Sequence, residues 1–241
     1  MINPYLSLWL EAPLQSWGTD SKFGRRDTQL FPTKSGVLGL VFAALGAGGE
    51  QRDFLAEFAS LDLVVISFSR RRNSYEGAVV DDGEPLLRDF QMVGSGYDDQ
   101  DIWSSLLSPK TREGKKAVGG GTKLTYRYYL QDAAFGVTLE VPLGKAIAIA
   151  ESLQSPSWDI YLGRKNCVPT DFIYRGSFET RDDAIANLHT VAEKKSRFES
   201  FRVTQGADDE ADEVITLNDV PIRFGEEKHY RERLVSITYA R

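Results

Sequence analysis

A lysine, a serine and a glycine stand where a helix is expected to begin, which is an arrangement suited to binding an anion. Residues 33–36 precede an apolar stretch that ends at Leu45. Free N–H groups and the dipole at a helix N-terminus favour negative charge. A P-loop would need glycines where Thr28 and Thr33 stand, so a nucleotide-triphosphate site of that type is excluded. Two interpretations remain: Lys34 and Ser35 bind a nucleic-acid phosphate, or this is an ordinary helix cap.

Basic and aromatic residues alternate in a predicted strand over 122–129. Lys123, Thr125, Arg127 and Tyr129 share one face, because side chains alternate along a strand. Such a face can contact phosphate and stack on a base. A half-buried strand with one solvated face would produce the same alternation, so both interpretations stay open.

A second candidate phosphate site consists of Gly163 followed by Arg164 and Lys165. Glycine allows close approach of another backbone, and the two cations supply phosphate contacts. By contrast, His189, His229 and Cys167 have no metal-ligand spacing. No catalytic serine motif is present, and the sequence predicts neither a metal nor a cofactor.

The elements that must position these residues alternate between strands and helices. Strands are predicted over 5–11, 61–69, 86–93, 125–130, 135–141 and 159–162, and helices over 36–45, 51–60 and 145–153. This order is close to β-α-β-β-α-β, the ferredoxin-like plan that RNA-recognition domains also use. Beyond Pro169 we expect a short helix over 182–188 and a small β-rich appendage. Its strands are predicted over 201–203, 214–217, 222–224 and 234–239.

Composition limits the class of protein. With 241 residues, 41% of them hydrophobic and 27% charged, the chain fits one large globular domain with a small appendage. The longest apolar run, 36–47, is too short to span a bilayer. No secretory signal is visible, and a single cysteine is typical of a cytoplasmic protein.

The net charge of −6 argues at first against a nucleic-acid-binding protein. The charges are segregated, however: residues 208–213 hold five acidic groups, whereas residues 100–130 hold six basic groups against two acidic ones. Local potential decides whether a polyanion binds. We expect the acidic run to be a loop on the face away from RNA, because like charges repel phosphate.

Five segments resemble, in order and spacing, the CasD family of subunits of the type I-E CRISPR Cascade complex, within the RAMP superfamily. They are residues 10–18, 31–40, 88–93, 128–135 and 161–169. The resemblance covers residues 2–170 and is weak after that. It implies an α+β fold with a ferredoxin-like palm over 1–169, a thumb inserted at about 97–123, and a β-rich region over 170–241.

The resemblance also implies a function. The chain would be a non-catalytic subunit that caps the 5′ handle of the guide crRNA, beside the backbone and large subunits, meeting target DNA only through the complex. It would act in the cytoplasm without a membrane partner. Trp103, Leu106 and Leu107 would pack on the backbone subunit. The expected RNA-binding residues are Lys22, Arg25, Arg26, Lys34, Ser35, Gly36, Arg88, Lys110, Arg112, Lys115, Lys116, Lys123, Arg127, Tyr129, Arg164 and Lys165.

Two alternatives remain. A related branch of the superfamily cuts precursor crRNA without a metal, using a tyrosine, a lysine and a histidine. An endoribonuclease of that kind needs a group that titrates near neutral pH, for which only His189 and His229 qualify. The chain would otherwise be a protein-interaction module whose basic clusters face acidic partners.

Overall fold

The computed structural model describes residues 2–18, 24–73, 79–81, 84–93, 110–115 and 123–240. Helices and mainly antiparallel strands mix along the chain, so the α+β class is confirmed. The elements are β1 (Tyr5–Glu11), β2 (Leu14–Gln15), β3 (Arg25–Arg26), α1 (Lys34–Leu45), α2 (Arg52–Phe58), β4 (Leu63–Ser69), β5 (Arg71–Asn73), β6 (Val79–Asp81), β7 (Leu87–Val93), β8 (Lys123–Gln131), β9 (Ala134–Glu140), the 3₁₀ turn η1 (Leu143–Lys145), α4 (Ala146–Gln154), β10 (Tyr174–Phe178), α5 (Arg181–Lys194), β11 (Phe198–Gln205), β12 (Glu213–Arg223) and β13 (His229–Tyr239).

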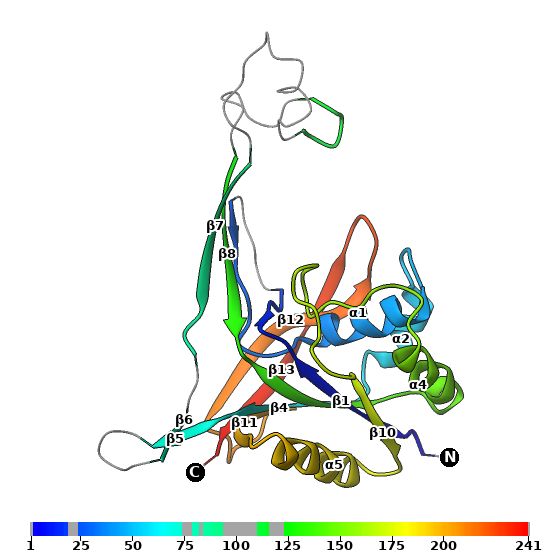
Figure 1. Ribbon diagram of the computed structural model, residues 1–241. Coiled ribbons are helices and arrows are strands. Elements are labelled where there is room, and N and C mark those ends of the chain that lie inside the picture. Colours follow the sequence, from blue (N-terminus) through cyan, green and yellow to red (C-terminus); the bar gives the residue numbers. More distant parts are fainter. Residues whose placement is uncertain are drawn as a thin grey trace.

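A seven-stranded antiparallel sheet forms the body, in the order β10-β1-β9-β4-β11-β13-β12 (Figure 1). Strands that follow residue 170 lie at both ends of it. β10 pairs with β1 at one edge, and β11, β13 and β12 continue the sheet beyond β4. The C-terminal region therefore shares one sheet with the N-terminal part of the chain.

Helices cover both faces of this sheet because β1 is apolar on both sides. Leu6, Leu8 and Leu10 pack in one core with α1, α2 and α4. Trp9 faces the other way, into a second core with α5, and Ser7 Oγ donates to the Ala184 carbonyl of α5 at 2.9 Å. The sheet is therefore covered by α1, α2 and α4 on one face and by α5 on the other.

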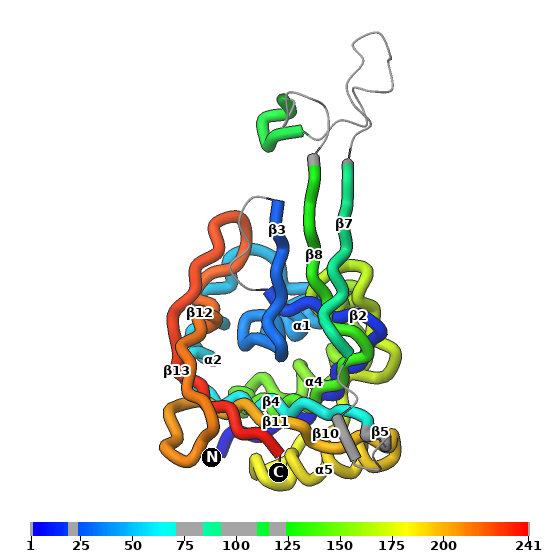
Figure 2. The backbone as a smooth tube through the Cα atoms, turned by 90° about the vertical axis from the view of Figure 1, so that its left-hand side faces the viewer, coloured from blue at the N-terminus to red at the C-terminus, as the bar shows by residue number. Residues whose placement is uncertain are grey.

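A separate two-stranded arm, formed by β7 and β8, leaves the body (Figure 1). β3 runs parallel to β8 along its other side, and β2 pairs with the lower end of β8 (Figure 2). β8 then turns directly into β9 of the large sheet. The path of the arm is therefore set by the turn between β8 and β9.

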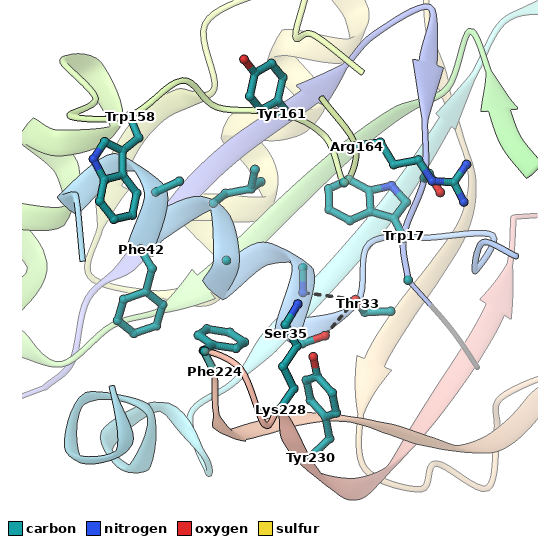
Figure 3. Close-up of a pocket in the computed structure, with 18 of the residues that line it drawn as sticks. Trp17, Thr33, Ser35, Phe42, Trp158, Tyr161, Arg164, Phe224, Lys228 and Tyr230 are labelled. Atoms are coloured by element: carbon teal, nitrogen blue, oxygen red, sulfur yellow. Dashed lines mark hydrogen bonds between the residues drawn. The ribbon is translucent and has the colours of Figure 1, made fainter. Parts of the chain in front are cut away.

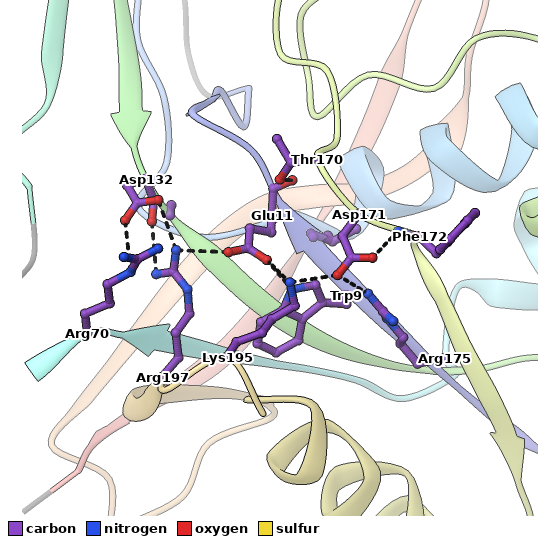
Figure 4. Close-up of polar contacts among 12 residues, drawn as sticks. Trp9, Glu11, Arg70, Asp132, Thr170, Asp171, Phe172, Arg175, Lys195 and Arg197 are labelled. Atoms are coloured by element: carbon purple, nitrogen blue, oxygen red, sulfur yellow. Dashed lines mark hydrogen bonds and ion pairs between the residues drawn. The ribbon is translucent and has the colours of Figure 1, made fainter. Parts of the chain in front are cut away.

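A buried arginine fixes that turn (Figure 4). Arg197 follows α5 and donates to the Asp132 carbonyl at 3.1 Å, to Asp132 Oδ1 at 3.0 Å and to Glu11 Oε1 at 3.1 Å. Lys195 Nζ lies 2.7 Å from both Glu11 Oε2 and Asp171 Oδ2. Burial raises the pKa of Glu11, but hydrogen bonds from Lys195 and Trp9 outweigh it, so this pKa lies below its ordinary value. The carboxylate thus stays charged and joins the end of α5 to the base of the arm.

One sequence-based expectation about elements was wrong, and one predicted helix is longer than expected. Residues 159–162 form no strand, because Leu162 N–H donates to Cys167 O at 2.7 Å within a tight loop. The strand that follows α4 is β10 instead. The short helix expected over 182–188 is the longer α5, which begins after Thr180, whose side chain accepts from Asp183 N–H.

A second buried network holds the start of α1. The Lys34 side chain is fully buried, and its Nζ donates to Leu61 O at 2.6 Å, Gln205 Oε1 at 3.2 Å and Ala59 O at 3.3 Å. Its backbone N–H donates to Asp219 Oδ2 at 2.7 Å. Arg233 holds the same carboxylate at 2.7 and 2.9 Å. Burial, then Arg233, lowers the pKa of Lys34 to about 8.

The anion at this helix start is therefore a side chain of the protein. Asp219 lies on β12 and is 4% exposed. It satisfies a free N–H of α1 and pairs with Arg233, so it ties the helix to the β12–β13 hairpin.

We predict that Asp219→Ala lowers the free energy of unfolding by about 3 kcal/mol, because it leaves Arg233 buried without its partner and α1 without this cap. Urea unfolding measures the change. Asp209→Ala, in the exposed acidic turn, is the control and should change it by less than about 0.5 kcal/mol. Equal losses in the two variants would contradict the role given to Asp219.

Candidate nucleic-acid interface

A pocket of about 620 Å³ runs beside α1 (Figure 3). Its walls come from α1, from the loop that follows α4 over residues 157–164, and from the loop between β12 and β13. We call this pocket the groove. These elements are far apart in the sequence, so the groove exists only in the folded chain.

Glycines let the walls of the groove approach closely. A Cβ at Gly36 would lie 2.8 Å from Cε3 of Trp17, so α1 rests directly on that ring. Gly163 has a φ of +98°, and a Cβ there would lie 1.6 Å from the Ser16 carbonyl oxygen. Ser16 N–H donates to Leu162 O at 3.1 Å across the same contact. Only glycine fits at position 163.

Aromatic rings line one end of the groove. Phe42 and Phe224 meet edge to face, with ring centroids 5.5 Å apart. Trp158 lies over Gly48 and is 51% exposed. An exposed indole beside a glycine-rich wall is a suitable surface for stacking an unpaired base.

Arg164 and Lys228, two cations that line the groove, differ in their contacts. Arg164 Nη1 donates to Tyr128 O at 3.1 Å and Nη2 to Arg26 O at 2.9 Å, and its guanidinium lies 4.5 Å from the centroid of the Tyr129 ring. Arg164 therefore fastens the 157–164 loop to β3 and β8. Lys228, in contrast, is exposed at the groove and makes no ion pair with the part of the chain described here.

Two tyrosines of the groove act as hydrogen-bond donors at neutral pH. Burial raises the pKa of Tyr230, and burial followed by the nearby Asp159 raises the pKa of Tyr161. Neither histidine lines the groove. His189 lies on α5, with Nε2 3.1 Å from Glu199 Oε2, and His229 begins β13. The described lining thus contains no histidine, the side chain that most often acts as a general base near pH 7.

Among the described residues, no group of three acidic, histidine or cysteine side chains is placed to hold a metal ion. No helix in the described ranges is both long enough and apolar enough to span a membrane.

A family model for CRISPR-associated proteins (Cas_Cas5) matches residues 5–236. The chain belongs to this family. The resemblance drawn from the five sequence segments is therefore confirmed.

Known proteins agree with the assignment to the Cas_Cas5 family. The chain is 32% identical to the CRISPR system Cascade subunit CasD of Escherichia coli (strain K12) over 194 residues, which cover 78% of this chain and 77% of that protein. It is similar to a chain of a CRISPR RNA-guided surveillance complex, with a TM-score of 0.68, 26% identity, and 98% and 90% of the two chains covered. A Cas protein crystal structure matches with a TM-score of 0.58, 25% identity, and 98% and 94% covered.

Some residues predicted for RNA binding line the groove in this Cas_Cas5-family chain, and others do not. Arg26, Ser35, Gly36 and Arg164 line it. Lys34 does not, because its side chain lies in the interior. Tyr129 is 1% exposed beneath Arg164, so this ring cannot stack a base.

The remaining predicted residues lie on the arm, on exposed segments or outside the described ranges. Arg25 pairs with Asp27 at 2.8 Å, and Arg112 pairs with Glu226 at 2.5 Å. The described residues with exposed or partly exposed side chains away from the groove are Arg25, Arg88, Lys110, Arg112, Lys115, Arg127 and Lys165. Outside the described residues are Lys22, Trp103, Leu106, Leu107, Lys116 and the side chain of Lys123.

The exposed rings of the arm lie on the face opposite to the predicted one. Phe90 and Tyr126 are paired across β7 and β8, 53% and 42% exposed, with ring centroids 5.3 Å apart. Met92 and Leu124 continue the same face. Arg25 lies 4.9 Å from the ring centroid of Tyr128, on this face too.

Sequence reasoning missed Trp158, Phe224, Lys228 and Tyr230, which line the groove. The only local signal was the turn-forming sequence at 224–228, which placed a lysine between two predicted strands. Nothing in the sequence indicated that this turn would lie beside α1.

We predict that Arg164→Ala lowers the free energy of unfolding by about 2 kcal/mol, because two carbonyl oxygens lose a charged donor and Tyr129 loses its stacked guanidinium. Arg164→Lys should recover less than half of this loss, since one ammonium cannot replace the planar fork. Denaturant unfolding and limited proteolysis at the base of the arm measure the effect. Lys165→Ala changes the exposed neighbour and should leave the unfolding free energy and the proteolysis pattern unchanged. An equal effect in Lys165→Ala would argue against a fastening role for Arg164.

Proposed function

We propose that the chain is a non-catalytic crRNA-binding subunit of a type I-E CRISPR Cascade complex, in which it caps the 5′ handle of the guide RNA. The observation that carries the proposal is the groove. It combines an exposed indole, glycine-lined walls and the cation of Lys228 in a chain 32% identical to a Cascade subunit. Unpaired RNA is recognised by stacking, close backbone approach and phosphate contacts of this kind.

We further propose that β1, β4, β9 and β10, with α1 and α4, form the ferredoxin-like palm of the family. The order β10-β1-β9-β4 and the antiparallel pairing of these strands support this. The thumb is proposed at about 97–123, between β7 and β8 in the sequence, and its Trp103, Leu106 and Leu107 would meet the backbone subunit. The large subunit would lie beside the handle, and the complex would act in the cytoplasm.

The position of the acidic turn is compatible with this role. Residues 208–212 precede β12 and Glu213 begins it, whereas the loop that lines the groove follows β12. A strand of this length spans roughly 35 Å, which is several times the Debye length of about 8 Å at physiological salt. Repulsion between the acidic turn and RNA in the groove is therefore screened.

Geometry gives no support to the alternative of an endoribonuclease. The groove tyrosines hold raised pKa values, and the described lining contains no histidine. We therefore propose that this chain binds RNA and leaves cleavage to another subunit.

We predict that Lys228→Ala weakens binding of the handle RNA about fivefold and reduces the slope of log K against log salt by about 0.7, because one phosphate contact is lost. Affinity is measured in the assembled complex over a range of salt concentrations. Lys194→Ala removes the same charge from α5, on the far face of the sheet, and should leave both quantities unchanged. An unchanged slope in Lys228→Ala would exclude this lysine as a phosphate ligand.

We also predict that the purified chain leaves repeat RNA intact in EDTA, since the described lining of the groove contains no histidine, the usual general base near pH 7. Gel analysis of labelled repeat RNA measures this. A specific cut that disappears in His229→Ala or His189→Ala would overturn the non-catalytic role.

A further inference from the structure

A second, more polar pocket of about 480 Å³ adjoins the groove. Gly18, Thr33, Ser35 and Tyr230 line both cavities, so the two meet at the start of α1. Tyr230 points from β13 toward Ser35 (Figure 3). We call this second cavity the side pocket.

The outer wall of the side pocket is built from paired residues of the β12–β13 hairpin. Asn218 and Glu232 stand directly opposite each other in the register, and Thr216 lies two residues before Asn218. Side chains two apart on a strand share a face, as do directly opposed residues. An amide, a carboxylate and a hydroxyl are therefore presented together.

The carboxylates of the side pocket differ in their partners. Asp219 is committed to Lys34 N–H and Arg233. The Glu232 side chain is exposed and makes no ion pair or hydrogen bond within the described part of the chain. It is therefore the acceptor that the fold leaves available.

This combination selects against phosphate and in favour of a base edge. A free carboxylate repels the sugar–phosphate backbone but accepts hydrogen bonds from an amino group. Cytosine and adenine present such amino groups, whereas the pyrimidine O4 that uracil shares with thymine is an acceptor. Asn218 adds a donor and an acceptor, and Tyr230, which stays protonated, adds a donor.

We propose that the side pocket binds one unpaired nucleobase that carries an exocyclic amino group, and that Glu232 and Asn218 discriminate it from uracil. This rests on the proposed function, because the base belongs to RNA whose backbone lies in the adjoining groove. The groove holds the strand through stacking and phosphate contacts, and the side pocket reads one base of it. Glu232 is thereby a specificity-determining residue and Lys228 an affinity-determining one.

The test is a competition assembly. The full chain is co-expressed with the other subunits of its complex and a guide RNA whose 5′ handle is randomised one position at a time, and the bound RNA is sequenced. At one position, uracil should be depleted about tenfold relative to the amino-bearing bases. Glu232→Gln should reduce that depletion to less than threefold, because its amide can donate to uracil O4. The other positions should not change.

Two controls separate base reading from general effects. Asp209→Asn removes the same charge from the acidic turn, outside both pockets, and should keep the wild-type profile. Asn218→Asp, which replaces amide donors with acceptors, should deplete uracil more strongly than the wild type. If Glu232→Gln changes recovery at all positions alike, or lowers only the yield of partner subunits, the side pocket does not read a base.

Failure of the proposed function gives a different result. In that case the wild-type complex would retain no handle RNA in preference to unrelated RNA, whatever its sequence. Retention of handle RNA with no position at which Glu232→Gln alters the base profile would overturn the base-reading inference alone.

Discussion

The carboxylate of Asp219 is the interaction on which the two cavities beside α1 depend. It occupies the free N–H of Lys34 at the start of α1 and holds Arg233 in the same buried cluster. Because it lies on β12, the β12–β13 hairpin is fastened against α1. The loop at the end of that hairpin then forms one wall of the groove, and its outward face forms the wall of the side pocket. The Asp219 carboxylate thus accepts the hydrogen bond at the start of α1 and positions the hairpin that lines both cavities.

Two arginines have a comparable role for the arm. Arg197 fixes the turn between β8 and β9 through Asp132 and Glu11, and Arg164 fastens β3 and β8 to the 157–164 loop. Both use the planar guanidinium to hold carbonyl oxygens of different segments. The arm therefore leaves the body in a direction set by buried or half-buried polar contacts. A residue chosen as a phosphate ligand from its charge alone can thus be a structural clamp, as Arg164 is.

Local signals predicted most of the elements. Apolar periodicity predicted α1, α2, β4 and β9 to within a few residues. Ser35 and Gly36, chosen from the sequence as site residues, line the groove. Sequence could not predict burial, which removed Lys34 and Tyr129 from the surface, because burial depends on Asp219 and Arg164 more than thirty residues away. The same limit applies to Trp158, Phe224 and Lys228. They meet only because the sheet brings the hairpin and the loop after α4 to the two sides of α1.

A protein with a net charge of −6 can bind a polyanion if its acidic groups lie far from the binding surface or are paired with cations. The acidic turn lies at the far end of β12 from the groove, where salt screens it. Closer to the groove, Asp219 is neutralised by Arg233. Asp159 in the groove accepts a hydrogen bond from Tyr161 at 3.2 Å. The Glu232 carboxylate of the side pocket has neither an ion pair nor a hydrogen bond among the described residues. Such a charge weakens phosphate binding wherever it faces the backbone. It contributes favourably only when it faces the amino group of a base, and for this reason its position in a side pocket, off the line of the groove, indicates base recognition.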